Sequence, residues 1–240
     1  MRFLGWITAA CLLLTAGPAS AEWFADVYAG QSLTERHTVT LHTPPGQSVF
    51  RGVEFDQSLA YGGRFGRYFD AVPFFGVAVD LFNFSSPIGG GQSGAVDGCV
   101  PLGDCGGGRS SLKRIDIDSL SISADAMLRL PLLKTKSAPY GALQPYIAGG
   151  IPLFITTVTP RSTAVFRNHQ DATDVSFGIK AAGGIAFHIA PNLMLFGEYR
   201  YTHVQISVDD LEPASNPSAA GRLRTDLDTH SALIGLSARW

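Results

Sequence analysis

Charged side chains recur at alternate positions within segments that are otherwise apolar or rich in small residues. Asp80 follows Gly76 and Ala78 at every second position, and the serines before Asp125 are spaced in the same way. Successive side chains of a β-strand point to opposite faces, so these charges fall on one face of a strand and the apolar residues on the other. The charged positions on this face are four acids and five bases: Asp26, Arg64, Asp80, Asp125, Arg129, Lys180, Glu198, Arg200 and Arg239.

Nearly balanced charge on a buried face predicts an ion-pair network, because an isolated charge taken out of water is costly. The residues expected to form it are Arg64, Asp80, Asp125, Arg129, Lys180, Glu198 and Arg200. The alternative is a gated ion path, in which the pairs rearrange to let an ion pass. A narrow barrel interior leaves little room for open water, which argues against general diffusion.

The elements that position these charges are eight segments that alternate between apolar and polar residues. They lie near 23–32, 55–68, 74–84, 115–130, 143–155, 174–189, 193–204 and 228–240. Each has about ten to fifteen residues, enough for a tilted membrane-spanning strand. After residue 21 there is neither a helical period nor the run of about 18–20 apolar residues that a spanning helix needs. The pattern predicts an all-β fold, an eight-stranded antiparallel transmembrane β-barrel.

The polar face of these segments is unlike an ordinary solvated surface. It is rich in Gly, Ala and Ser, whereas the opposite face carries aliphatic and aromatic residues. Small residues suit the interior of a narrow barrel, so we expect the apolar face to point outward to lipid. The alternative is a soluble β-protein with its apolar side chains inside. Only 16% of the residues are charged, against roughly 25% in soluble domains, which favours the lipid-facing arrangement.

The connections between the segments alternate in length. Long connections lie near 33–54, 85–114, 156–173 and 205–227, short ones at 69–73 and 190–192, and 131–142 is intermediate. Bacterial outer-membrane barrels have short periplasmic turns and long extracellular loops. We therefore expect a periplasmic N-terminus and four long extracellular loops, which carry the specific function of the barrel.

Residues 1–21 are typical of a secretory signal peptide. Met1-Arg2 is followed by the apolar run Phe3–Leu14, and Ala19-Ser20-Ala21 supplies the small residues before a cleavage site. A membrane anchor is the alternative, but the apolar run is short for a spanning helix. We expect the segment to be removed, which leaves residues 22–240 as one barrel domain.

Cys99 and Cys105 lie in a glycine-rich part of the second long connection. In an exported chain they predict a disulfide, whereas a metal site would have too few ligands without a neighbouring histidine. The glycine runs 89–91 and 106–108 lack the Lys-Ser/Thr of a phosphate-binding loop. The net charge of −2 offers no basic surface to a nucleic acid. We expect neither a cofactor nor a nucleic-acid partner.

Four segments carry a resemblance to a known family: 61–66 (YGGRFG), 144–150 (QPYIAGG), 198–203 (EYRYTH) and 226–231 (DLDTHS). In them the chain resembles the small eight-stranded outer-membrane β-barrels, the OmpA-like and opacity-type proteins, over residues 22–240. The resemblance implies the outer membrane of a Gram-negative bacterium, contact with its lipids and lipopolysaccharide, insertion by the barrel-assembly machinery and a monomeric state. It leaves the activity and any extracellular ligand open, because the family is functionally mixed.

The last segment ends on an aromatic residue. Ala232, Ile234, Leu236, Ala238 and Trp240 share one face. Ile234, Leu236 and Trp240 look like the C-terminal signal by which barrel proteins are recognised for assembly, although phenylalanine is the usual last residue. A terminal aromatic also suits the aromatic girdle at the membrane surface.

Some small outer-membrane barrels modify lipid A, and residues 199–203 faintly resemble the start of a deacylase site, with His230-Ser231 on the next strand. A hydrolase needs an exposed nucleophile, a base within hydrogen-bonding distance and a third group that orients the base. After His203 the chain reads Val204-Gln205-Ile206-Ser207, without the expected His-x-Ser-Asn pattern. We therefore expect a non-enzymatic structural or surface-interaction role, in adhesion or envelope integrity. The alternatives are a narrow pore or small-solute channel, and a lipid-A-modifying enzyme.

Overall fold

The computed structural model describes residues 22–43, 46–89, 92–96, 108–112, 114–135, 138, 140–160, 171–211 and 221–240. All helical or strand structure in these ranges is β-strand. Within them no helix is long and apolar enough to cross a membrane. The expected signal peptide and the cysteines Cys99 and Cys105 lie outside the described residues. Signal cleavage and the disulfide therefore stay predictions.

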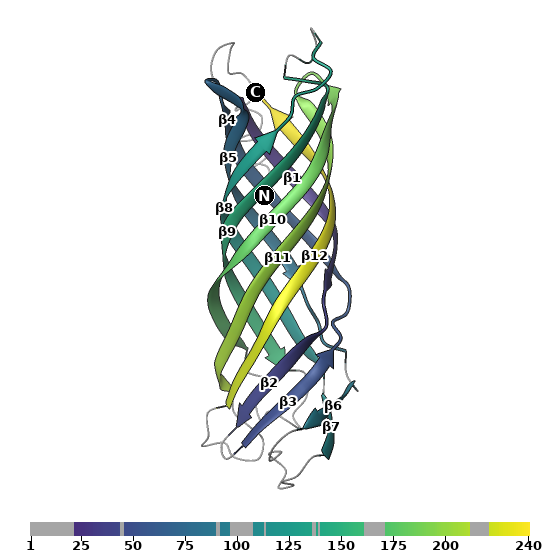
Figure 1. Ribbon diagram of the computed structural model, residues 1–240, viewed down its shortest axis with the longest axis vertical. Helices are drawn as coiled ribbons and strands as arrows, with labels where there is room; N and C mark the ends of the chain where they lie inside the picture. The colour runs from purple at the N-terminus through teal and green to yellow at the C-terminus, as the bar shows by residue number, and fades with distance from the viewer. Residues whose placement is uncertain are drawn as a thin grey trace, which may run out of the picture.

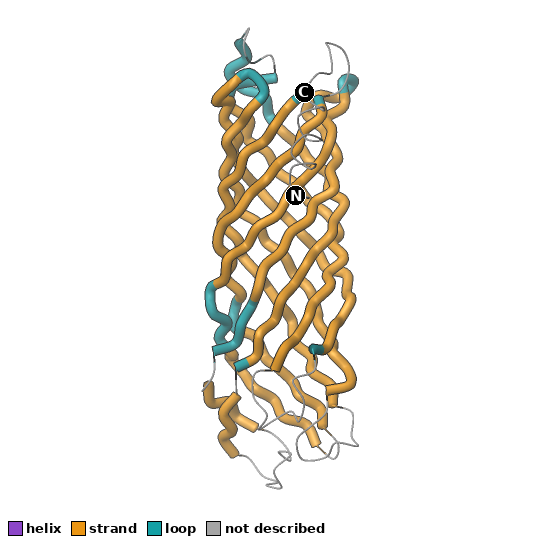
Figure 2. Tube along the Cα trace, turned by 180° about the vertical axis from the view of Figure 1, so that it is seen from behind, coloured by secondary structure: helices purple, strands orange, loops and turns teal. Residues whose placement is uncertain are grey.

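Eight strands form a closed antiparallel barrel, as Figures 1 and 2 show. They are β1 (Trp23–Thr34), β4 (Ser58–Phe69), β5 (Val72–Ser85), β8 (Ile115–Arg129), β9 (Leu143–Pro160), β10 (Ala172–Ala190), β11 (Leu193–Leu211) and β12 (Gly221–Arg239). Each strand pairs with the next, and β1 pairs with β12 from Phe24–Arg239 to Thr34–Thr229, which closes the ring. The all-β, eight-stranded antiparallel fold expected from the sequence is confirmed.

The two faces of the barrel wall differ as the alternation predicts. Side chains that point outward in the middle of the strands are aliphatic or aromatic, for example Val27, Val79, Ile147 and Ile234. The inward face there combines buried serines, threonines and charged residues with large side chains such as Phe82 and Phe196, where the sequence predicted small residues. The barrel therefore presents an apolar band to its surroundings, as a membrane-spanning barrel does.

The two ends of the barrel have different connections. Short turns join β4 to β5 and β10 to β11 at the end where the chain terminates, which is at the top of Figure 1. We call this the short-turn end. The long connections gather at the opposite end, the long-loop end, where Figure 1 shows β2, β3, β6 and β7.

The long connections contain strand structure where the sequence predicted loops. β2 (His37–Thr43) and β3 (Gly46–Val53) form one antiparallel hairpin, and β6 (Gln92–Val96) and β7 (Gly108–Leu112) form another. The strands β9 to β12 are 18 or 19 residues long and run past their expected ends at the long-loop end. The expected loops near 33–54, 85–114, 156–173 and 205–227 were therefore wrong in part.

The hairpin β2–β3 extends the barrel wall at the long-loop end. β1 pairs with β12 as far as Thr34–Thr229, and β2 pairs with β12 again from Thr40–Arg224 to His42–Arg222. β1 pairs with β4, and β2 pairs with β3. As β2 continues the wall beyond β1, β3 continues it beyond β4. The barrel wall therefore continues beyond the ends of β1 and β4 at the long-loop end.

The polarity of the wall inverts along this continuation. On β11, Leu195 is exposed and Glu198 is buried, whereas nearer the long-loop end Gln205 is exposed and Ile206 is buried. Small and polar residues were expected throughout the interior, but this end of it is apolar. The apolar tier, as we call it, consists of Val39, Phe50, Val53, Phe55, Phe84, Ile88, Ile115, Ile117, Phe154, Val158, Val204, Ile206, Val208, Leu223 and Leu227.

Glycines on the inward face leave space for large side chains that cross the interior. A Cβ atom at Gly62 would lie 2.6 Å from Tyr28 Oη and would also collide with the carbonyl oxygen of Leu81. A Cβ atom at the neighbouring Gly63 would meet only the carbonyl oxygen of Asp26, at 3.3 Å. The two glycines therefore differ in what they must accommodate.

We expect Gly62→Ala to destabilise the barrel more than Gly63→Ala, because the second Cβ atom meets a single backbone oxygen at 3.3 Å. Overpacking a filled interior costs typically about 1–3 kcal/mol. The free energy of unfolding, measured by urea titration of tryptophan fluorescence in lipid vesicles, checks this. Equal stability of the two variants would show that the interior beside Gly62 has room for a methyl group.

Candidate functional site

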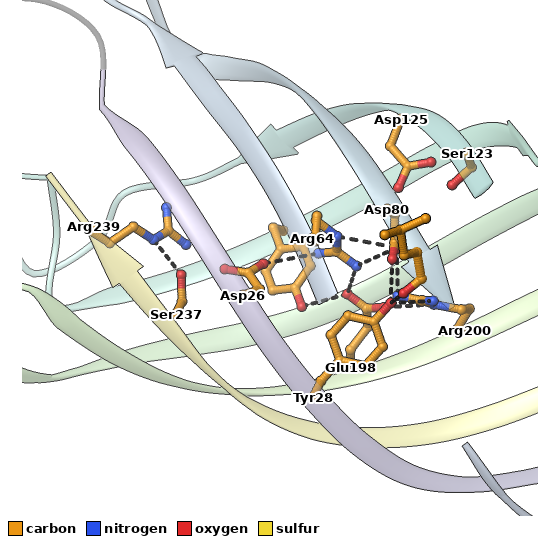
Figure 3. Close-up of polar contacts among 12 residues, drawn as sticks. Asp26, Tyr28, Arg64, Asp80, Ser123, Asp125, Glu198, Arg200, Ser237 and Arg239 are labelled. Atoms are coloured by element: carbon orange, nitrogen blue, oxygen red, sulfur yellow. Dashed lines mark hydrogen bonds and ion pairs between the residues drawn. The ribbon is translucent and has the colours of Figure 1, made fainter. Parts of the chain in front are cut away.

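Asp80 on β5 is the centre of a cluster of charged side chains inside the barrel (Figure 3). Its carboxylate accepts hydrogen bonds from Lys180 Nζ at 2.8 Å, from Arg200 Nη2 at 2.9 Å and from the hydroxyl of Tyr28. Arg64 Nε lies 3.4 Å from the same carboxylate. These four partners come from β10, β11, β1 and β4, so one carboxylate joins five strands.

Glu198 on β11 is the second acid of this cluster. It accepts hydrogen bonds from Arg64 Nη2 at 2.7 Å, from Arg200 Nη2 at 2.7 Å and from Tyr146 Oη at 2.8 Å. Both arginines therefore contact both Glu198 and Asp80. A buried guanidinium shared between two carboxylates compensates more of its lost hydration than a single partner would.

Lys180 on β10 connects the cluster to β8. Besides Asp80, its ammonium group donates to Asp125 Oδ2 at 2.5 Å and to Ser123 Oγ at 2.6 Å. An ammonium group has three donors, and each of these has an acceptor here. Lys180 is therefore satisfied although it is buried.

Arg129 belongs to a second group, nearer the short-turn end. It forms an ion pair with Glu22, and its guanidinium lies 3.7 Å from the centre of the Tyr68 ring. Arg239 Nη1 lies 3.3 Å from the same carboxylate of Glu22. The two arginines thus share one acid, and among the described residues their ion pairs are with Glu22 and not with the Asp80 cluster.

The residues that the sequence assigned to one network are distributed over these two groups. Six of them meet around Asp80: Arg64, Asp80, Asp125, Lys180, Glu198 and Arg200. Arg129 lies outside this cluster. Asp26 lies between Arg239 and the cluster in Figure 3, and its carboxylate is 3.6 Å from Arg64 Nη1.

Sequence reasoning missed the neutral members of the cluster. Tyr28, Tyr146 and Ser123 hydrogen-bond to its charged groups but carry no charge themselves. Their positions carry a usable signal, since Tyr28 has the same parity as Asp26 and Ser123 the same parity as Asp125. Glu22 was missed because it precedes the first alternating segment.

The Asp80 cluster neutralises its own charges. It contains three acids and three bases, and the side chains of its ion pairs are between 0% and 1% exposed. An ion crossing the barrel would have to displace these pairs and leave buried charges uncompensated. The arrangement is suited to closing the interior and cross-linking the strands. In the described part of the chain, no three His, Cys, Asp or Glu side chains are placed to hold a metal ion.

His203 and His230, the residues compared with a deacylase site, lie toward the long-loop end. His230 Nε2 is 2.8 Å from Glu35 Oε1, and His230 Nδ1 is 2.5 Å from Tyr199 Oη. Ser231 is buried, and its hydroxyl lies 2.6 Å from that of Ser32. Adjacent residues of a strand face opposite sides, so His230 and Ser231 do not form a nucleophile–base pair.

The C-terminal residues close the ring at the short-turn end. Ile234 and Leu236 point outward, and the ring of Trp240 lies 6.3 Å from that of Phe65. Backbone hydrogen bonds of 2.8 and 3.1 Å join Trp23 and Trp240. The role of Ile234, Leu236 and Trp240 as an assembly signal stays a prediction.

A closed β-barrel with an apolar outer band and paired charges inside defines a transmembrane β-barrel. A family model described as the outer membrane protein beta-barrel domain matches residues 7–239. The chain belongs to this family, so its recognition as an outer-membrane barrel is confirmed, as is its place in the outer membrane of a Gram-negative bacterium. With the usual orientation of the family, the short-turn end is periplasmic and the long-loop end extracellular.

The chain is similar to solved structures of outer-membrane proteins. The outer membrane protein OprG from Pseudomonas aeruginosa is 15% identical, with a TM-score of 0.58 over 92% of this chain and 96% of that chain. Neisserial surface protein A is 13% identical, with a TM-score of 0.49 over 93% of this chain and 100% of that chain. Among curated proteins, no sequence matches.

We expect Asp80→Ala to destabilise the barrel far more than Asp209→Ala. Removing Asp80 leaves buried cations without their partner, which costs typically about 3–5 kcal/mol. Asp209 pairs with Arg222 at the surface, where both side chains are more than half exposed, and such pairs contribute about 0–1 kcal/mol. Urea unfolding of both variants in the same lipid checks this. Comparable losses would mean that the Asp80 cluster is not a principal source of stability.

Proposed function

We propose that this protein is a closed, non-enzymatic barrel with a surface-interaction role, and that its extracellular strands and loops make the contacts. The observation that supports this proposal is the filled interior. The Asp80 cluster occupies the middle of the barrel, and the apolar tier occupies its extracellular end. A barrel filled by its own side chains has its remaining binding capacity at the surface, chiefly in loops held by the rigid wall.

The extracellular wall offers a polar surface for such contacts. Outward-facing charges occur in exposed pairs, Arg36 with Glu54 and Arg222 with Asp209. Arg36 and Glu54 lie directly before β2 and directly after β3, and Asp209 and Arg222 lie on β11 and β12, beyond the apolar band at the long-loop end. These charges remain in water, so they are available to a polar partner outside the cell.

Substitutions on the hairpin β2–β3 and directly after it test this role. His42, Arg51 and Glu54 are exposed, so replacing all three by serine changes the surface and leaves the buried side chains in place. We expect adherence of expressing cells to a panel of extracellular-matrix proteins and epithelial cells to fall severalfold, because the variant removes polar contacts.

The matched control replaces Asp70, Lys134 and Asn192, which are exposed at the short-turn end, by serine and should leave adherence unchanged. Heat-modifiable gel migration verifies that both variants fold. Equal adherence of cells with and without the wild-type protein, across the whole panel, would contradict the proposed surface role.

A channel for small apolar solutes is the second candidate, and the apolar tier is the observation that favours it. The interior at the extracellular end is lined by fifteen buried apolar side chains. An apolar molecule could enter between them if they moved apart. On the periplasmic side of the apolar tier lies the Asp80 cluster. An apolar solute that passed it would separate its ion pairs without replacing them. We therefore rank this function below the surface role.

Purified protein in lipid bilayers distinguishes the two candidates. We expect no reproducible conductance steps, and uptake of a small apolar dye into proteoliposomes no faster than into protein-free vesicles, because the interior is filled. The Asp209→Ala variant serves as a folded control with an unchanged interior. Saturable dye uptake or stable conductance steps would favour the channel and contradict the closed barrel.

A further inference from the structure

One arginine lies on the outer face of the barrel at the short-turn end. Arg67 is near the end of β4, and Trp23 of β1 lies directly opposite it in the register. Residues 66 and 68 are buried and face the interior, so the side chain of Arg67 points outward. A guanidinium group therefore stands next to the membrane at the periplasmic end of the wall.

Aromatic rings hold this guanidinium group in place. Arg67 Cζ lies 5.4 Å from the centre of the Trp23 ring and 5.8 Å from the centre of the Phe69 ring, within the range of a cation–π interaction. The two rings belong to an aromatic patch on the outer face, which consists of Trp23, Phe65, Phe69, Phe75 and Trp240. Such rings are typical of the depth at which lipid headgroups meet the hydrocarbon.

Arg67 has no acidic partner in the part of the chain that the structure describes. Its Nε–H is enclosed and lacks a hydrogen-bond acceptor, whereas its two Nη groups are not enclosed. Glu22, the residue before Trp23, directs its carboxylate to Arg129 and Arg239 inside the barrel. The inward arginines at this end are thus paired, and Arg67 keeps its donors for a partner from outside the protein.

We propose that Arg67 binds the phosphate group of a glycerophospholipid in the periplasmic leaflet of the outer membrane. A guanidinium group presents paired N–H donors that match two oxygens of one phosphate. Because Nε is enclosed, the two Nη groups supply these donors. The inference concerns the membrane-facing wall and does not depend on the proposed surface role.

The wall beside Arg67 favours a lipid over a soluble phosphate. Val77 is opposite Arg67 in the register with β5, and Phe65 is opposite Val79, one step nearer the middle of the barrel. All three apolar side chains are exposed on the outer face. A phospholipid whose phosphate lies at Arg67 places its acyl chains on these residues, and burial of this apolar surface adds to the binding. A soluble anion gains nothing from them.

Native mass spectrometry of the purified barrel, released from detergent micelles, tests the site. The protein is supplied with phosphatidylglycerol, with a diacylglycerol of the same acyl chains, or with glycerol phosphate. We expect one molecule of phosphatidylglycerol to stay bound and neither of the other two, because binding needs both the phosphate and the chains. Retention of glycerol phosphate as strong as that of the lipid would indicate a site for soluble phosphate and contradict the proposal.

Three variants separate a specific contact from the general attraction of a positive charge. Arg67→Gln should lower the ratio of lipid-bound to lipid-free protein about tenfold, the effect of losing a hydrogen bond to a charged group. Arg67→Lys keeps the charge without the paired donors, so its ratio should lie between those of wild type and Arg67→Gln. Lys134→Gln is the matched control, since it removes one positive charge from an exposed residue at the same end of the barrel. It should retain the lipid.

Heat-modifiable migration shows whether each variant is folded, and the comparison of the three ligands with the wild-type protein does not need the variants. Equal retention of phosphatidylglycerol and the diacylglycerol would overturn the proposal, because the phosphate would then be irrelevant. A folded Arg67→Gln variant that keeps the lipid would overturn it as well. So would a Lys134→Gln variant that loses as much lipid as Arg67→Gln.

Discussion

The pairing of Asp80 is the interaction on which the rest of the barrel depends. A carboxylate buried in a narrow interior must be surrounded by donors, and here they come from four other strands. Because Arg64 and Arg200 also serve Glu198, the two acids depend on the same cations. A slip of one residue in any of these strands would turn its charge toward lipid. The cluster therefore fixes the register of the strands as well as closing the interior.

The cluster determines where the small residues must be. The two tyrosines that donate to its acids, Tyr28 and Tyr146, extend across the interior. A Cβ atom at Gly62 would lie 2.6 Å from Tyr28 Oη, and one at Gly184 would lie 2.7 Å from Tyr146 Oη. These glycines are thus spaces into which the tyrosines fit. The glycine content and the buried charges are two aspects of one packing arrangement.

Parity along the strands was sufficient to predict the barrel and the inward charges, because the period of two is a property of the extended backbone. It could not show which charges meet, since this depends on register between strands: Lys180 reaches Asp80 from a strand 100 residues away. It also failed at the strand ends. On β11 the apolar residues Leu195 and Tyr199 occupy odd positions, but Val204 and Ile206 occupy even ones. Apolar and polar residues still alternate there, but the apolar ones now lie on the opposite face of the strand. In the sequence this change looks like the end of the strand.

This change of phase marks where the wall leaves the membrane. Within the apolar band the surroundings are lipid, so polar groups turn inward and must satisfy one another. Beyond it the surroundings are water, and the same strands bury Ile206 and Leu227 while exposing Gln205. Tyr199 and His230, whose rings are amphipathic, stand at the transition. The extracellular part is therefore stabilised by the hydrophobic effect in water, like a soluble β-barrel, whereas the membrane part combines the Asp80 cluster with buried aromatic residues such as Phe82 and Phe196. Along the described strands one apolar cluster runs through the interior, and the buried charges add a polar centre to it where lipid lies outside.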